Sequence, residues 1–121
     1  MRQVWILIAE DYSYLASFIE KGLKKSGFET LVASNGLQAL TLMQQEPVDL
    51  LVLDLGLPIK NGWEVLQEVR LRNLDLPIIV VTAATDERDR KRVLQMGATD
   101  YLPKPFRFSD LLTKIKFYLN I

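Results

Sequence analysis

The acidic residue Asp54 interrupts one of the most apolar stretches of the sequence. Residues 50–53 are Leu-Leu-Val-Leu, and the apolar pattern resumes at Leu55 and Leu57. A short run of this kind is typical of a strand that is buried on both faces. An ionised carboxylate is costly in that setting unless it is paired, bound to a metal or placed at the end of the strand. We therefore expect Asp54 to lie at the exposed end of its strand, held rigidly and within reach of a reactant.

Other polar residues follow or end neighbouring apolar runs, namely Glu10 and Asp11, Thr82, and Lys104. Three carboxylates that lie close together repel one another, and a hard divalent cation with oxygen ligands, such as Mg²⁺, relieves that repulsion. A lysine and a hydroxyl can donate hydrogen bonds to phosphoryl oxygens. Together these groups match phosphoryl transfer to or from a carboxylate nucleophile.

The composition excludes several other kinds of site. The 121 residues include no Cys and no His, which rules out disulfides, zinc thiolates and imidazole-based acid–base chemistry. Fifteen basic and fifteen acidic residues give a formal net charge of zero, which argues against a domain that binds nucleic acid by bulk charge. No apolar run is long enough to cross a bilayer, and none has the features of a signal peptide.

These candidate residues are spaced along a regular alternation of strand and helix patterns. Strands are predicted at 4–9, 28–33, 49–54, 77–82 and 99–102, and helices at 12–26, 36–45, 63–72, 86–96 and after a capping Ser109. The helix at 86–96 is mostly charged, and its chief apolar anchors are Val93 and Leu94. We therefore expect it to be among the least stable elements.

Alternating strands and helices predict one α/β domain. Parallel strands need right-handed crossovers, which place helices on both faces of the sheet. Five such units fit a flavodoxin-like (βα)5 fold, a doubly wound five-stranded parallel sheet in the order 2-1-3-4-5. Ligands bind such sheets beside the carboxyl ends of strands 1 and 3, which is where Glu10, Asp11 and Asp54 are expected.

Four motifs in order resemble one known family. They are Glu10-Asp11, "DLGLPIKNGWEVL" (54–66), "VVTAAT" (80–85) and "GATDYLPKPF" (97–106). The sequence resembles a response-regulator receiver domain, the CheY-like module of two-component signalling, and is nearest in pattern to OmpR/PhoB-type receivers. The resemblance covers residues 1–121 and leaves no output domain in this chain.

The resemblance implies a cytoplasmic phosphoacceptor rather than an enzyme that turns over a separate substrate. Asp54 would accept a phosphoryl group from a sensor histidine kinase or a phosphotransfer protein, in a reaction that needs Mg²⁺ or Mn²⁺. Glu10, Asp11, Asp54 and the backbone carbonyl of Gly56 would hold the metal. The domain would catalyse its own phosphorylation and slow dephosphorylation, and small residues at Gly56 and Ala84 would leave the acyl phosphate open to water.

The resemblance also implies how the phosphoryl group is sensed. Lys104 would contact it, with a cis bond between Lys104 and Pro105. Thr82 would move to bond a phosphoryl oxygen, and Tyr101 would turn inward behind it.

The signal would leave through a surface formed by residues 86–96, 99–102 and the last helix, to control an output domain or partner, with transcription as the output. A possible homodimer would use this surface, with Arg90 meeting Asp110 and Asp100 meeting Lys114 across a two-fold axis. No direct contact with nucleic acid or membrane is expected of this domain.

Simpler interpretations remain open for the single residues. Asp11 could be a helix N-cap, Thr82 could satisfy a strand end, and Tyr101 could be packing. Lys104 could be a solvated charge, and the bond before Pro105 could be trans.

Three other protein classes also remain open: a flavin-binding flavodoxin, a haloacid-dehalogenase-type phosphatase and a receiver-like binding module that is not phosphorylated. A flavodoxin requires a phosphate cradle where Glu10 and Asp11 stand. The phosphatase requires a second Asp where Gly56 stands. The intact set of acceptor, acids, Thr and Lys argues against the third class.

Overall fold

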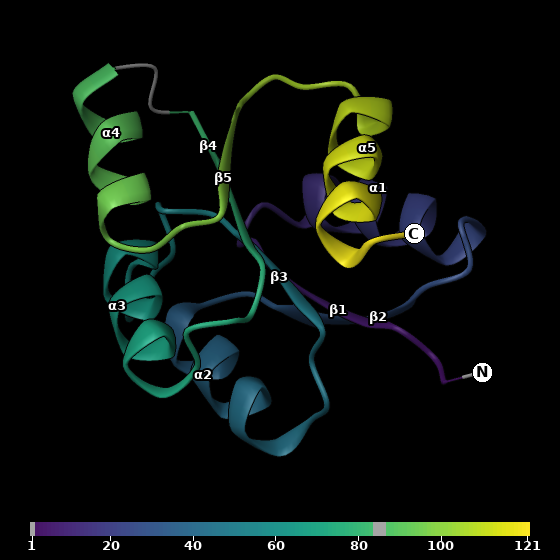
Figure 1. Cartoon of the computed structure of the whole chain (residues 1–121), viewed down its shortest axis with the longest axis horizontal. Helices are drawn as coiled ribbons and strands as arrows, with labels where there is room; N and C mark the ends of the chain where they lie inside the picture. Colours follow the sequence, from purple (N-terminus) through teal and green to yellow (C-terminus); the bar gives the residue numbers. More distant parts are fainter. Residues whose placement is uncertain (1, 84–86) are drawn as a thin grey trace.

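The computed structural model describes residues 2–83 and 87–121. Within these residues, five strands alternate with five helices along the chain (Figure 1). The strands are β1 (Trp5–Ala9), β2 (Glu29–Ala33), β3 (Leu50–Leu53), β4 (Ile78–Thr82) and β5 (Asp100–Pro103). The helices are α1 (Ser13–Lys25), α2 (Gly36–Gln45), α3 (Gly62–Arg72), α4 (Glu87–Gln95) and α5 (Phe108–Leu119). Ala84 and the predicted helix start at residue 86 lie outside the described residues.

All strand pairs of the described sheet are parallel, and the strand order is β2-β1-β3-β4-β5. This confirms the predicted flavodoxin-like α/β architecture. Ala9, the last residue of β1, lies opposite Leu53, the last residue of β3. Beyond that pair, the Asp54 N–H donates to the Ala9 carbonyl at 2.9 Å. The two strand ends therefore bring the acids that follow β1 next to Asp54.

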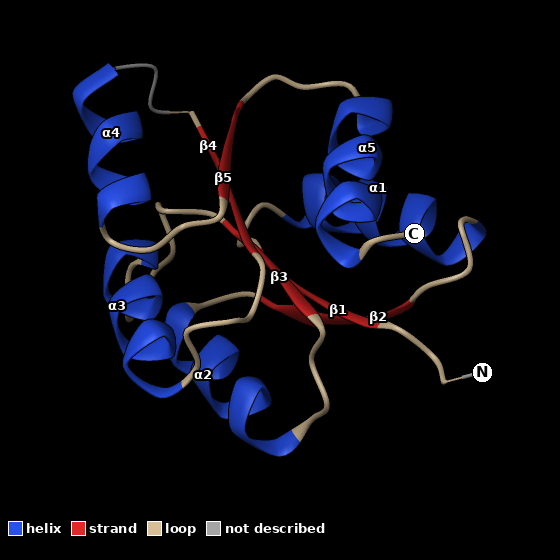
Figure 2. Cartoon of the chain, in the orientation of Figure 1, coloured by secondary structure: helices blue, strands red, loops and turns tan. Residues whose placement is uncertain are grey.

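Helices cover both faces of the sheet, with α1 and α5 on one face and α2, α3 and α4 on the other (Figures 1 and 2). Side chains alternate between the two cores along each strand. Ile6 and Ile8 lie in the core under α1 and α5, whereas Leu7 and Ala9 lie in the opposite core. This double burial explains why the strands are nearly continuous apolar runs. Of the helices described, none is long and apolar enough to span a bilayer.

At three helix ends the expected type of capping or terminating residue is present, and at two N-termini the residue considered from the sequence is not the cap. The Asn35 and Asn61 side chains accept hydrogen bonds from backbone N–H groups in the first turns of α2 and α3. Gly27, beyond the end of α1, takes a φ of +94°. The predicted cap at Ser109 is wrong, because α5 begins at Phe108 and Ser109 lies inside its first turn. The N-cap of α1 is Tyr12, so Asp11 does not fill that role.

Candidate functional site

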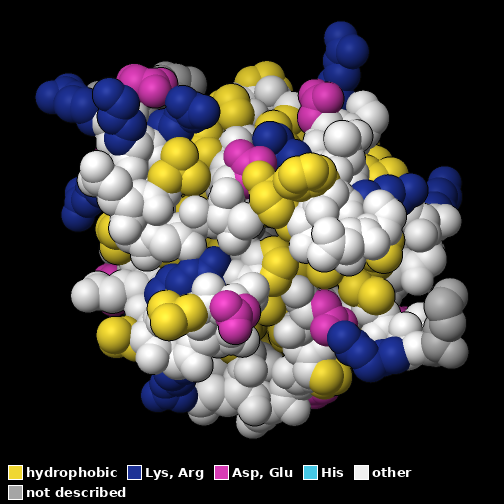
Figure 3. Space-filling view, in the orientation of Figure 1, with side chains coloured by type: hydrophobic (Ala, Val, Ile, Leu, Met, Phe, Trp, Pro, Cys, Tyr) yellow, Lys and Arg dark blue, Asp and Glu magenta, His cyan; other side chains and the backbone are white. Residues whose placement is uncertain are grey.

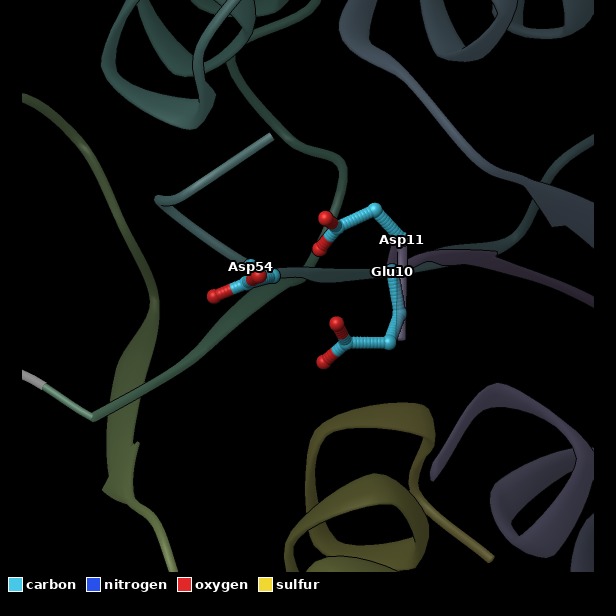
Figure 4. A group of neighbouring side chains, drawn as sticks. All are labelled: Glu10, Asp11 and Asp54. Atoms are coloured by element: carbon cyan, nitrogen blue, oxygen red, sulfur yellow. The ribbon is translucent and has the colours of Figure 1, made fainter. Parts of the chain in front are cut away.

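Three carboxylates converge at the carboxyl edge of the sheet. Glu10 and Asp11 follow β1, and Asp54 follows β3. One carboxylate oxygen from each residue lies within 4.8 Å of the others, and Figure 4 shows the three groups projecting toward a common space. The structure therefore brings together the three acidic side chains that the sequence predicts as a set.

Burial differs among the three acids. Glu10 is 3% exposed and Asp54 is 7% exposed, whereas Asp11 is exposed. Asp54 was expected at an exposed strand end, and the structure shows that its side chain is more deeply buried than that. Gly56 is itself exposed, and a Cβ built on it would lie 3.7 Å from Asp54 Oδ2. The missing side chain at Gly56 leaves this side of the Asp54 carboxylate uncovered.

Lys104 supplies positive charge to this cluster. Its Nζ donates to Glu10 Oε1 at 2.6 Å and lies 3.5 Å from Asp54 Oδ1. The Tyr12 backbone N–H donates to the other Glu10 oxygen at 3.1 Å. Burial raises the pKa of Glu10 above its usual range, and repulsion from Asp54 adds to the rise. The hydrogen bonds from Lys104 and Tyr12 lower the pKa, but by less than burial raises it. The Glu10 carboxylate is therefore ionised at a cost that a second cation would reduce.

Thr82 lies on β4, the strand next to β3, and Tyr101 lies on β5, on the far side of β4. Thr82 ends β4 and is buried, and its carbonyl accepts a hydrogen bond from the Lys104 N–H at 2.8 Å. Tyr101 lies in β5 and is already buried, with 8% exposure, and this burial raises its pKa. The peptide bond between Lys104 and Pro105 is cis. Thr82 and Lys104 therefore stand at adjacent strand ends, as predicted from the parallel sheet.

The donor set suits a hard divalent cation. Carboxylate oxygens are the ligands that Mg²⁺ prefers, and the chain has no Cys or His to bind a softer metal. Among the described residues, three carboxylates meet the ammonium of Lys104, which lies 2.6 Å from Glu10 and 3.5 Å from Asp54, so acidic groups outnumber basic ones in the cluster. Glu10, Asp11 and Asp54 therefore fit Mg²⁺ by donor chemistry and by charge.

The residues predicted for a dimer surface already have partners within their own chain or lie exposed. Asp100 Oδ2 accepts from Lys114 Nζ at 2.9 Å and from the Tyr118 hydroxyl at 2.7 Å. Arg90 donates to Glu87 of the same helix at 3.1 Å, and Asp110 is exposed. Asp100 and Lys114, which were predicted to pair between two chains, thus form an ion pair within one chain, and the predicted pairing across a two-fold axis stays a prediction.

Asp100, Lys114 and Tyr118 form a hydrogen-bonded group, which we call the Asp100 cluster. The pKa values of Asp100 and Tyr118 are both shifted in it. Burial alone would raise the pKa of Asp100, but hydrogen bonds from Lys114, Tyr118 and the Tyr101 N–H outweigh it and lower the pKa. The same hydrogen bond to Asp100 raises the pKa of Tyr118 to about 12. The sequence analysis missed Tyr118, because a tyrosine on an amphipathic helix has no pattern that marks a polar partner.

Two contacts that α3 makes, one with α4 and one with the turn after it, also escaped the sequence analysis. The Arg92 guanidinium carbon lies 4.6 Å from the centroid of the Trp63 ring. Arg70 Nε donates to the Gly97 carbonyl at 2.7 Å. Both pairs join residues that are far apart in sequence, so helical periodicity carries no sign of them.

Comparisons with known proteins agree with this geometry. Residues 6–116 match the model of the family described as response regulator receiver domain. The transcriptional regulatory protein CusR of Escherichia coli (strain K12) is 38% identical over 115 residues, which cover 95% of this chain and 51% of CusR. The transcriptional regulatory protein CpxR of Klebsiella pneumoniae subsp. pneumoniae (strain HS11286) is 43% identical over 95% of this chain and 49% of CpxR. The chain thus spans about half the length of these curated relatives.

Solved structures show the same likeness. The receiver domain of the Francisella response regulator 1452 superposes with a TM-score of 0.93 at 29% identity, covering 98% of both chains. The receiver domain of sensor histidine kinase PA1611 from Pseudomonas aeruginosa PAO1 has a TM-score of 0.89 at 29% identity, covering 99% of this chain and 100% of that one. That structure holds a magnesium ion coordinated in its active site cleft.

Proposed function

Because the chain belongs to the response regulator receiver domain family, we propose that it accepts a phosphoryl group on Asp54. The donor would be a phosphohistidine of a sensor histidine kinase or of a phosphotransfer protein. The observation that carries this proposal is the meeting of Asp54 with Glu10, Asp11 and Lys104 at one edge of the sheet. The chain would be a signalling module that catalyses its own phosphorylation and slow dephosphorylation, not an enzyme with a separate substrate.

Mg²⁺, or Mn²⁺ in its place, would be held by Glu10, Asp11, Asp54 and the carbonyl of Gly56. When bound, the ion would supply positive charge to the transferring phosphoryl oxygens. The acidic cluster supports this assignment, as does the magnesium ion in the related receiver of PA1611. The exposed Asp11 faces solvent, from which a hydrated ion must arrive.

The side chains of the site divide the remaining work. An oxygen of the Asp54 carboxylate forms the new bond to phosphorus as the phosphorus–nitrogen bond of the donor breaks, and the imidazole leaves with that electron pair. Lys104 moves from Glu10 to a phosphoryl oxygen, and the Thr82 hydroxyl donates to another. Tyr101, in the neighbouring strand, then rotates further inward and changes the surface formed by α4, β5 and α5.

The output of this surface would be control of transcription, as in the relatives named as transcriptional regulatory proteins. We place the domain in the cytoplasm, where its kinase and its output would meet. A homodimer would form through α4, β5 and α5 by exchange of Arg90 and Asp110, together with Asp100 and Lys114.

Intact mass spectrometry tests the proposal directly. With Mg²⁺ and acetyl phosphate, the chain should gain one phosphoryl mass, and a chelator should prevent the gain. Asp54→Asn keeps the shape of the side chain and removes the nucleophile, so it should stay unmodified. Asp75→Asn removes an exposed carboxylate outside the cluster and should gain the mass as the wild type does. Equal labelling of Asp54→Asn and wild type would contradict the assignment.

A further inference from the structure

Trp63 is joined to the backbone of the acceptor through one glycine. The Gly62 N–H donates to the Leu55 carbonyl at 2.9 Å. A Cβ on Gly62 would lie 2.2 Å from the Asp54 carbonyl oxygen, so the two backbones are in close contact there. Trp63 follows directly, in the first turn of α3. Because this contact leaves no free space, a displacement of the backbone at Asp54 should also displace Gly62 and Trp63.

One side chain of α4, that of Arg92, stacks on the Trp63 ring. The guanidinium carbon of Arg92 lies 4.6 Å from the centroid of its ring, in the arrangement of a cation–π contact. Trp63 is half-buried against the core between the sheet and helices α2 to α4, and Arg92 is exposed. Figure 3 shows Lys and Arg side chains gathered over α4.

The rest of α4 is weakly attached along its length and firmly attached at its end. Of the α4 residues, all of which the structure describes, Val93 alone is buried. Beyond the end of the helix, the Gly97 carbonyl accepts from Arg70 Nε at 2.7 Å, and Arg70 also donates to the Thr99 hydroxyl at 3.2 Å. These hydrogen bonds fix the turn after α4 to α3. The contact of Arg92 with Trp63 is a single stacking interaction made by an exposed side chain. We therefore expect it to break before the hydrogen bonds at the turn do.

We propose that the contact between Arg92 and Trp63 holds α4 in its unphosphorylated position and is broken when a phosphoryl group is bound at Asp54. The backbone contact of Gly62 with Asp54 links the acceptor to Trp63, on which Arg92 of α4 is stacked, and the turn after α4 is held by Arg70. A shift of the Asp54 backbone on phosphoryl binding would thus move Trp63 away from Arg92, while the turn at Gly97 stays attached to α3. Arg92 and Trp63 would be positioning residues, since neither touches the reacting atoms. The inference rests on the proposed function of Asp54.

Coupling of this kind is reciprocal. If a bound phosphoryl group breaks the contact, loss of the contact must favour the bound form by the same factor. An exposed cation–π contact corresponds to about a two- to fivefold change in an equilibrium constant. Removing the Arg92 charge should therefore tighten binding of a phosphoryl mimic by that factor.

A protein with one tryptophan makes the test direct. Trp5 and Trp63 are the two tryptophans of the chain, and Trp5 lies at the start of β1, at the opposite end of that strand from Glu10. In a Trp5→Phe background, beryllium fluoride with Mg²⁺ is titrated by calorimetry while Trp63 emission is recorded. We expect the emission to change on binding. Arg92→Gln should bind about two- to fivefold more tightly and show a smaller emission change.

Two matched variants separate the contact from general effects of charge. Lys91→Gln removes one positive charge from the neighbouring exposed position of α4 and should keep the background affinity. Arg92→Lys keeps a cation near the ring and should largely restore the background behaviour. Background affinity in Arg92→Gln, or Trp63 emission that is the same with and without bound ligand, would overturn the inference. Absence both of ligand binding and of a mass gain from acetyl phosphate in the background protein would instead overturn the proposed function.

Discussion

Lys104 is hydrogen-bonded to Glu10 and not to the proposed acceptor. Its Nζ lies 2.6 Å from Glu10 Oε1 and 3.5 Å from Asp54 Oδ1. Both carboxylates are buried, so this lysine offsets the repulsion between them. The same ammonium lies near enough to Asp54 to reach a phosphoryl group placed there, at the cost of the hydrogen bond to Glu10.

Removing the Lys104 charge should expose the repulsion within the acidic cluster. We expect Lys104→Met to lower the free energy of unfolding in chelator by about 1–3 kcal/mol, because a buried carboxylate loses its partner. Mg²⁺ should then stabilise this variant more than it stabilises the wild type. Urea unfolding with and without Mg²⁺ measures both effects, and Lys116→Met provides a control at an exposed position of α5. A variant as stable as the wild type in chelator would show that the pair with Glu10 contributes little.

A second prediction concerns Mg²⁺ and the wild-type chain. An ion that binds the folded cluster should stabilise the fold by about 1.4 kcal/mol at a concentration near ten times its Kd. Asp11→Ala removes one donor and should reduce this gain, and it should also slow phosphorylation. Thermal melting across a Mg²⁺ titration, with Na⁺ at matched ionic strength as the control, provides the measurement. Melting of the wild type that ignores Mg²⁺ at millimolar levels would count against the metal site.

The sequence analysis identified the acidic cluster because parallel strands place their carboxyl ends at one edge. Glu10, Asp54, Thr82 and Lys104 each end or follow an apolar run, so their meeting depends on strand order alone. The sequence could not predict which side chains pair within the cluster. Glu10 and Asp11 have no local cationic partner in the sequence, and the structure supplies one from Lys104, across the sheet. That pair depends on a side-chain direction that no spacing encodes.

For helix α4, too, the sequence predicted only part of the packing. Its charged sequence correctly indicated a weakly anchored helix, and Val93 is fully buried as expected. Leu94, the other expected anchor, is 38% exposed because it falls on the outer face. With so few apolar residues, the amphipathic pattern could not fix which face is inward. The contact of Arg92 with Trp63 that helps to hold the helix has no periodic pattern at all.

The open space beside Gly56 predicts an effect on the lifetime of the acyl phosphate. A Cβ at this position would lie 3.7 Å from Asp54 Oδ2, so a longer side chain would lie over the phosphoryl group and hinder attacking water. We expect Gly56→Arg to slow hydrolysis several-fold, as measured by loss of the phosphoryl mass over time. Ser109→Arg adds the same charge at an exposed position of α5 and should decay as the wild type does. Equal lifetimes for all three proteins would remove steric shielding as an explanation.

The Asp100 cluster predicts a pH dependence of stability at alkaline pH. The hydrogen bond to Asp100 raises the pKa of Tyr118 to about 12 in the folded state, from about 10 in the unfolded chain. This contribution is fully present below about pH 10 and is lost as the pH rises toward 12. Tyr118→Phe should lower the free energy of unfolding by about 0.5–1.5 kcal/mol at neutral pH. The difference from the wild type should shrink between pH 10 and 11.5.

Urea unfolding across this range tests the Tyr118 prediction, with Tyr14→Phe as an exposed control. On the acid side the sign is reversed, because the pKa of Asp100 is lowered in the folded state. Its contribution is present above the unfolded pKa near 4 and is lost as the pH falls below it. A Tyr118→Phe difference that stays constant up to pH 11.5 would show that the hydrogen bond does not govern the Tyr118 ionisation.

The last prediction is that phosphorylation produces a homodimer through α4, β5 and α5. Asp100 is already bonded to Lys114 and Tyr118 of its own chain, whereas Arg90 pairs with the exposed Glu87 of its own helix, so Arg90 and the exposed Asp110 can exchange with less loss. Each exposed ion pair contributes about 0.2–1 kcal/mol, and a two-fold axis makes two copies of it, so the pair is worth about 0.4–2 kcal/mol per dimer. Sedimentation of the phosphorylated chain should show a dimer at low salt that weakens at high salt. Arg90→Asp should dissociate it, and adding Asp110→Arg should partly restore it, because the exchanged charges attract again. A monomer under every condition, or a double variant no better than Arg90→Asp, would contradict the dimer and leave the assignment of Asp54 untouched.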